Sequence, residues 1–124
     1  MEISLVCCDP SRQNLSQVVA ASLGLAEIES RLLHREEQNL PADQAKGLHL
    51  AAAHETHGEV TYLQEVLEGG FFVYVGEPSA LEEHWFGPGS WVAFNDDRGS
   101  GHASKVGPQG CKRIFRLLRG QLDR

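Results

Sequence analysis

Cysteines and histidines that follow apolar segments are the first residues of this sequence that could do chemistry. Cys7 and Cys8 close one apolar run, and the segment His54–His57, with a histidine at each end, follows another. Thiolates and imidazoles bind zinc and related metals, so Cys7, Cys8, His54 and His57 could form a thiol or metal site. Their spacing is not that of the His-Glu-x-x-His zinc motif. We therefore expect no metal centre, and we keep a thiol- or metal-dependent enzyme as an alternative.

Other catalytic and phosphate-binding motifs are missing from the sequence. Gly107–Lys112 precedes a segment of helical spacing and could offer backbone amides to an anion. It has neither the G-x-x-x-x-G-K-[ST] nor the G-x-G-x-x-G pattern, and no G-x-S-x-G turn occurs in the chain. We expect a protein without enzymatic activity and without a cofactor.

Segments of alternating periodicity indicate the elements that would position such residues. Five apolar or alternating segments predict strands: Ile3–Cys8, Ala26–Leu33, Leu48–Ala53, Phe71–Val75 and Ser90–Phe94. Helical spacing predicts a helix from Asp9-Pro10 to Leu23 and another over Ile114–Leu122. The capping boxes Thr56–Glu59 and Ser79–Glu82 predict two more helix starts.

Strands that alternate with helices favour a parallel sheet covered on both faces, because right-handed crossovers place the helices there. The sequence therefore predicts one α/β domain over residues 1–124, a three-layer flavodoxin-like fold. Its five-stranded parallel sheet has the order 2-1-3-4-5, with Ile3–Cys8 in the middle and Ala26–Leu33 at an edge.

Ligands of open parallel sheets bind outside the carboxyl ends of the strands. The predicted strand ends supply five candidate binding residues: Cys8, Asp9, His54, Glu55 and Asp96. Asp9 also suits a helix cap, and Cys8 suits a small strand residue.

The charge of the chain is divided between an acidic body and a basic end. The net charge is −6; residues 1–97 carry 4 Lys/Arg against 16 Asp/Glu, and residues 98–124 carry 7 against 1. An acidic body argues against nucleic-acid binding, since phosphates need clustered cations. No apolar run reaches the ~20 residues of a membrane helix, and no signal peptide opens the chain. We expect a soluble cytoplasmic protein.

Two segments carry a family resemblance. Leu5–Arg12 reads Leu-Val-Cys-Cys-Asp-Pro-Ser-Arg, and Lys112–Arg119 forms a basic, apolar-periodic end. Both resemble response-regulator receiver domains, which have an acid pair shortly after the first strand. Cys7 and Cys8 stand in the place of that magnesium-binding pair, and Ala53-His54 in the place of the phosphoacceptor aspartate. The resemblance implies a degenerate pseudo-receiver that cannot be phosphorylated in the usual way.

We therefore expect a non-catalytic regulatory or protein-interaction module whose partner is another protein, and we leave a homodimer open. Because receivers commonly bind partners through their last strands and last helix, the expected interface contains Trp85, Phe86, Trp91, Arg113, Arg116 and Arg119. The acidic body supports a second hypothesis, an inhibitor or immunity-type protein that binds a basic toxin or enzyme.

Overall fold

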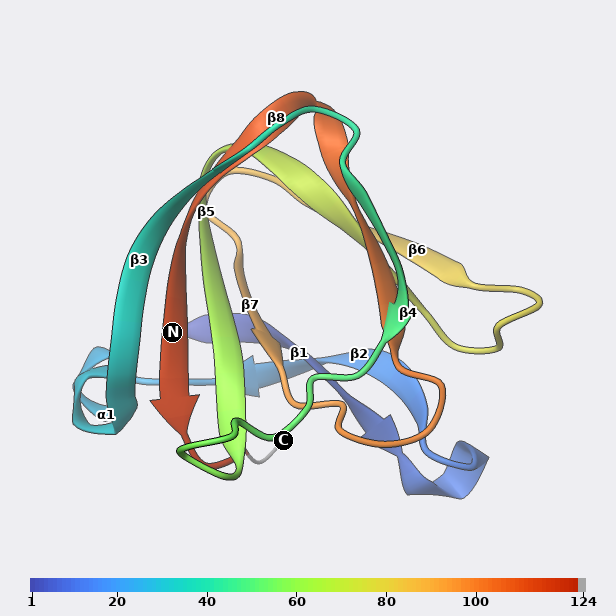
Figure 1. The fold of residues 1–124 in the computed structure, drawn as a ribbon, viewed down its shortest axis with the longest axis horizontal. Helices are drawn as coiled ribbons and strands as arrows, with labels where there is room; N and C mark the ends of the chain where they lie inside the picture. The colour runs from blue at the N-terminus through green and yellow to red at the C-terminus, as the bar shows by residue number, and fades with distance from the viewer. Residues whose placement is uncertain (123–124) are drawn as a thin grey trace.

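Strands make up most of residues 1–122, the part of the chain that the structure describes. In the computed structural model these residues form eight strands and one short α-helix (Figure 1). The strands are β1 (Glu2–Asp9), β2 (Leu15–Ser22), β3 (Leu32–Leu40), β4 (Ala45–His49), β5 (Val60–Val75), β6 (Glu82–Phe86), β7 (Trp91–Phe94) and β8 (His102–Arg119), and the helix is α1 (Leu25–Arg31).

The strands form one mixed sheet that is mainly antiparallel. Its order is β2-β1-β7-β5-β8-β3, with β4 paired to β8 and β6 paired to β5. Only β1 and β7 run parallel among the described pairs. The predicted flavodoxin-like fold with its parallel order 2-1-3-4-5 is therefore wrong, as are the resemblance to receiver domains and the pseudo-receiver signalling role drawn from it.

The helix predicted from Asp9-Pro10 to Leu23 is instead a short helical turn followed by the strand β2. The chain reverses direction after Arg12, earlier than the helical spacing of its apolar residues indicated. Asp9 does cap a helical turn, accepting a hydrogen bond from the Ser11 amide at 3.0 Å, but that 3₁₀ turn ends at Arg12. Gln13 and Asn14 then adopt φ of 58° and 61°, which returns the chain along β1 as a hairpin. Cross-strand pairing with β1 outweighs the helical spacing of β2.

The helices expected after Thr56 and over Ile114–Leu122 are instead the long strands β5 and β8. The strand expected over Ala26–Leu33 is instead mostly the helix α1. Ile3–Cys8, Phe71–Val75 and Ser90–Phe94 are confirmed as the strands β1, the second half of β5, and β7. Ala26–Leu33 instead contains α1, which an ion pair between Glu27 and Arg31 at 3.0 Å supports at i,i+4 spacing. Ser79–Glu82 leads into β6, and Leu48–Ala53 leaves the sheet after His49.

β5 and β8 pair along almost their whole length and bend together near their middle. The pairing is irregular between Val66 and Phe71, where Gly69 faces Cys111. Gly69 has φ of 69°, and a side chain there would collide with the Gly110 carbonyl, so the bend needs glycine. Figure 1 shows the consequence: the two strands arch over the molecule, with β3 and β4 descending on its two sides.

The arch separates two apolar clusters on opposite faces of the sheet. One contains Leu5, Leu63 and Leu118 with the buried side of α1. The other lies under the arch and contains Phe71, Val73 and Phe94. Side chains alternate between the two faces because successive strand residues point in opposite directions. The second cluster does not fill its face of the sheet completely, and the space that it leaves is the candidate site.

Candidate functional site

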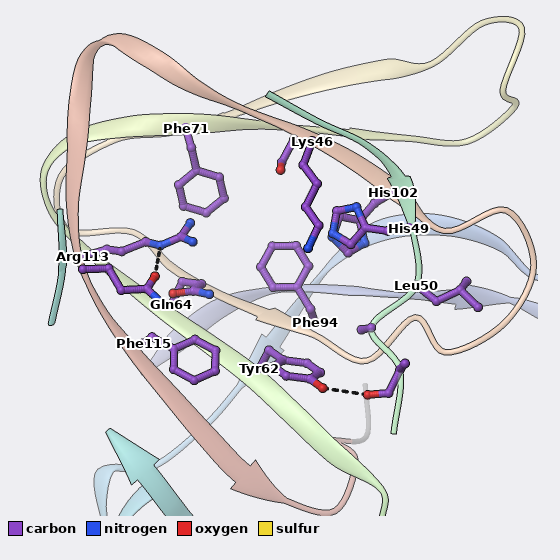
Figure 2. Close-up of a pocket in the computed structure, with 14 residues that line it drawn as sticks. Lys46, His49, Leu50, Tyr62, Gln64, Phe71, Phe94, His102, Arg113 and Phe115 are labelled. Carbon is purple, nitrogen blue, oxygen red and sulfur yellow. Dashed lines mark hydrogen bonds between the residues drawn. The ribbon is translucent and has the colours of Figure 1, made fainter. Parts of the chain in front are cut away.

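A cavity of about 380 Å³ lies under the arch. Its wall combines aromatic rings with polar and basic groups, and Figure 2 shows these side chains entering from β3, β4, β5, β7 and β8. The lining residues are Gln38, Lys46, His49, Leu50, Ala51, Ala52, Tyr62, Gln64, Phe71, Phe94, His102, Ser104, Arg113 and Phe115. A volume of this size is typical of sites for small molecules.

The period of two in the strands explains why these residues share one wall. Arg113 and Phe115 are two apart on β8, and their neighbours across the sheet are Val66 and Gln64 on β5. On the other side of β8, Gln38 of β3 pairs directly with Arg113. Residues opposite each other across a sheet point to the same face, so this row of side chains faces the cavity.

Arg113 is a cation without an acidic partner among the described residues. Its Nε donates a hydrogen bond to Gln38 Oε1 at 2.9 Å, and its guanidinium carbon lies 5.1 Å from the centre of the Phe71 ring. Burial lowers the pKa of Arg113 below its ordinary value, although guanidinium groups in proteins stay protonated. The remaining guanidinium N–H groups are therefore available to an anion in the cavity.

Gln64 adds an unused hydrogen-bonding group to the same wall. Its side chain is only 7% exposed, and its Oε1 has no hydrogen-bond partner among the described residues. A buried polar atom without a partner costs free energy, on the order of 1–3 kcal/mol. Such atoms are uncommon in folded proteins, and this one belongs to a residue of the cavity wall.

A buried acid holds His102 in a fixed orientation at the other end of the cavity. Asp96 is fully buried and follows β7; its Oδ2 accepts hydrogen bonds from His102 Nδ1 and from Ser16 Oγ, both at 2.7 Å. Since the carboxylate accepts, His102 carries a proton on Nδ1. Asp96 does not line the cavity, so the Nε2 edge of the ring is the edge left to face it.

His49 lies against His102 across the β4–β8 pairing. The two ring centres are 4.2 Å apart, and His49 Nδ1 is 2.7 Å from the Gly47 carbonyl oxygen. The close approach depends on Gly101, because a side chain at that position would collide with the His49 carbonyl. Burial lowers the pKa of His49 below 6.5, and the nearby His102 and Lys46 add to this, while Asp96 opposes it.

The depressed pKa of His49 predicts an acid-sensitive stability. As the pH falls below about 6.5, unfolded chains bind the His49 proton before folded chains do, so the free energy of unfolding decreases until the folded pKa is passed. We expect His49→Gln to reduce the loss of stability between pH 7.5 and pH 5.5, measured by urea unfolding. An unchanged loss in the variant would contradict this assignment.

The cavity is basic although the protein is acidic. Lys46 and Arg113 line it together with two histidines, and its lining contains neither aspartate nor glutamate. Figure 2 shows Lys46 and the histidines on one side and Arg113 on the other, with Phe94 between them and Phe71 over Arg113. A second hollow of about 190 Å³ also touches Lys46 and Arg113, and its lining likewise lacks acidic residues. The arrangement favours an organic anion.

The five residues predicted from strand ends are not gathered into one site. Asp96 does not line the cavity, but it holds His102, which does. The Cys8 thiol donates a hydrogen bond to the Arg98 carbonyl at 3.4 Å. Asp9 caps the 3₁₀ turn. His54 and Glu55 lie in the turn before β5, where His54 Nδ1 accepts from the Thr56 amide at 3.1 Å.

The alternative thiol or metal site does not assemble in the described part of the chain. Cys7 and Cys8 lie on β1, and the His54 and His57 rings are 4.9 Å apart in the turn before β5. Among residues 1–122, no three histidine, cysteine or acidic side chains are placed to hold one metal ion.

The residues predicted to form one interface lie in separate places. Trp85 is 49% exposed on β6, while Phe86 is buried. Trp91 and Arg116 do come together: the guanidinium carbon is 4.9 Å from the indole centre, and Arg116 also binds Glu65 at 2.9 Å. Arg113, Arg116 and Arg119 were expected on or next to the last helix, but they lie on the strand β8. Their role in binding a protein stays a prediction.

Comparisons with known proteins add no family. No family model, curated protein or solved structure matches this chain. Within residues 1–122, no helix has the length and apolar character required to cross a membrane. The functional argument therefore depends on the cavity.

Sequence reasoning missed most of the cavity. Gln38, Lys46, His49, Tyr62 and Gln64 were not singled out, and Arg113 was placed on a surface. No alternating pattern marked β8 as a strand, since Lys112–Phe115 reads Lys-Arg-Ile-Phe.

Proposed function

We propose that this protein binds a small organic anion, a carboxylate with an apolar or aromatic body, in the cavity under the arch. The observation that carries the proposal is the partly buried guanidinium of Arg113, whose hydrogen-bonded partner is the uncharged Gln38. A partly desolvated charge without a counterion is costly, and a bound carboxylate would reduce that cost.

The chemistry of the wall supports a carboxylate. An arginine guanidinium is planar and can donate two parallel hydrogen bonds to the two oxygens of one carboxylate. Gln64 lies in the same row of side chains, but its unpartnered Oε1 is an acceptor and needs a donor on the ligand other than the carboxylate. Lys46 and Arg113 together attract anions to a surface that is otherwise acidic.

The apolar part of the wall supports a hydrophobic or aromatic body. Phe71, Phe94, Phe115 and Tyr62 line the cavity, and the Tyr62 hydroxyl is turned away to donate to the Ala52 carbonyl at 2.8 Å. The Tyr62 and Phe115 ring centres are 6.1 Å apart. Flat or apolar ligands bury surface against such rings, and a few polar groups orient them.

A matched ligand series tests the proposal. Benzoate, phenylacetate and 3-phenylpropionate are compared with their primary amides by calorimetry and thermal unfolding. A ligand present at about 100 times its Kd adds about 2.7 kcal/mol to the free energy of unfolding, so we expect the best acid to raise Tm by about 5–15 °C. The amides should have little effect. Equal effects of acids and amides, or no binding of any acid, would contradict the proposal.

Binding to another protein, including a basic toxin or enzyme, stays a prediction. The exposed Trp85 and the acidic surface leave room for it, but no observation on the cavity depends on it.

A further inference from the structure

The histidine side of the cavity has the features of an acid–base site. His102 faces the cavity, and the Asp96 carboxylate that holds its Nδ1 is itself held by Ser16. This pattern fixes the tautomer: with the proton on Nδ1, the Nε2 lone pair of a neutral imidazole is turned toward the ligand. A buried carboxylate behind the ring also stabilises the imidazolium that forms when Nε2 takes a proton.

The Asp96 carboxylate is unusual as a structural element. It is 0% exposed, and its Oδ1 has no hydrogen-bond partner among the described residues, while both donors converge on Oδ2. An apolar residue would fill this position at a lower cost in desolvation. Buried acids of this kind, oriented on a histidine at a cavity wall, are typical of functional sites.

Lys46 and His49 complete the surroundings of His102. Lys46, an exposed residue of β4, lines the cavity with the two histidines, and besides burial its charge lowers the pKa of His49. An ammonium group near a base can stabilise negative charge that develops on a substrate oxygen. Burial lowers the pKa of His49, which favours the neutral form of that ring.

We infer that His102 is a catalytic base that removes a proton from a carbon atom of an enolisable organic acid, specifically a 2-oxo acid with an apolar or aromatic side chain. The inference rests on the proposed function, because Arg113 must hold the carboxylate. Phe94, which lies between Arg113 and the histidines, would contact the side chain. Asp96 and Ser16 are positioning residues.

The proton and electrons balance without another reactant. His102 Nε2 takes the proton from the carbon next to the carbonyl, and the electron pair of that C–H bond forms the carbon–carbon double bond of the enolate. The carbonyl π pair moves to the oxygen, where the Lys46 ammonium stabilises its charge. Return of a proton from His102 to the same carbon regenerates the 2-oxo acid. In D₂O, exchange of the Nε2 proton with solvent before its return introduces deuterium at that carbon.

Deuterium exchange tests this inference with a defined probe. The C3 protons of 4-phenyl-2-oxobutanoate are followed by ¹H NMR in D₂O, with and without the protein. We expect exchange at least about 100-fold faster than in buffer, the usual contribution of a positioned acid–base group. A base fixed on one face of the substrate should exchange one of the two C3 protons preferentially.

Variants separate the roles of the residues. His102→Gln should lose exchange and keep binding of the oxo acid, measured by calorimetry. His34→Gln changes an exposed histidine of β3 outside the cavity and should keep both exchange and binding. Asp96→Asn should lower the turnover number with little change in KM, because an amide donates to Nδ1 and places the histidine proton on Nε2. The dependence of the exchange rate on pH should also differ between Asp96→Asn and the wild type.

The failures are distinguishable. Binding of the oxo acid without exchange above buffer, or full exchange by His102→Gln, would overturn the catalytic inference and leave the anion site intact. If the wild-type protein neither bound the oxo acid nor catalysed exchange, and bound none of the simple carboxylates, the proposed function would be contradicted as well.

Discussion

Replacing Arg113 with methionine is expected to weaken benzoate-type carboxylate binding by about 100-fold, equivalent to about 2.7 kcal/mol. The unliganded variant should be as stable as the wild type or more stable. Methionine has a similar volume and needs no counterion, and replacing a poorly compensated buried charge with an apolar residue is often neutral or favourable. Calorimetry with the best carboxylate and urea unfolding without ligand measure the two effects.

Arg119→Met is the matched control for this experiment. Arg119 lies on the same strand, is exposed and does not line the cavity. It should leave carboxylate binding unchanged. If Arg113→Met destabilised the protein and kept its affinity for carboxylates, Arg113 would be a structural residue and the cavity would need another occupant.

Asp96→Ala is expected to lower the free energy of unfolding by about 2–6 kcal/mol, because it leaves two buried donors without an acceptor at about 1–3 kcal/mol each. Ser16 and His102 would both lose their acceptor, and both are nearly inaccessible to water. Urea unfolding at pH 7.5 measures the loss.

Asp97→Ala is the adjacent control. Its carboxylate binds Arg98 at 3.3 Å and Gln121 at 2.9 Å nearer the surface, so its removal should cost less than about 1 kcal/mol. Equal losses in the two variants would show that Asp96 has no special place in the structure.

Local patterns in the sequence located some strands correctly and assigned others to helices. Ile3–Cys8 and Phe71–Val75 are rich in β-branched and aromatic residues and are short, which distinguishes them from helices. Val60–Leu67 and Ile114–Leu122 have apolar residues at spacings that suit both periods. Their strand conformation follows from pairing with each other over more than 40 residues of separation, which local patterns do not contain.

The candidate site depends even more on distant pairing. Arg113 and Gln38 are neighbours only because β3 and β8 are paired, and His49 meets His102 through β4 and β8. Asp96 was identified because it follows an apolar strand, but its partners Ser16 and His102 lie on different strands. The negative net charge of the chain gives no sign of a basic cavity, because Lys46 and Arg113 are far apart in sequence.

The neighbours of β8 and β4 predict that the two walls of the cavity open at different rates. β8 is hydrogen-bonded to β5 along one side and to β3 and β4 along the other, so its central amides should exchange with solvent only when the whole sheet unfolds. β4 has five residues and pairs with β8 alone among the described strands, so it can detach in a local opening. Lys46 and His49 would move with it, while Arg113 and Phe115 stay in place. The cavity thus has one wall that keeps its shape and one through which a ligand can enter.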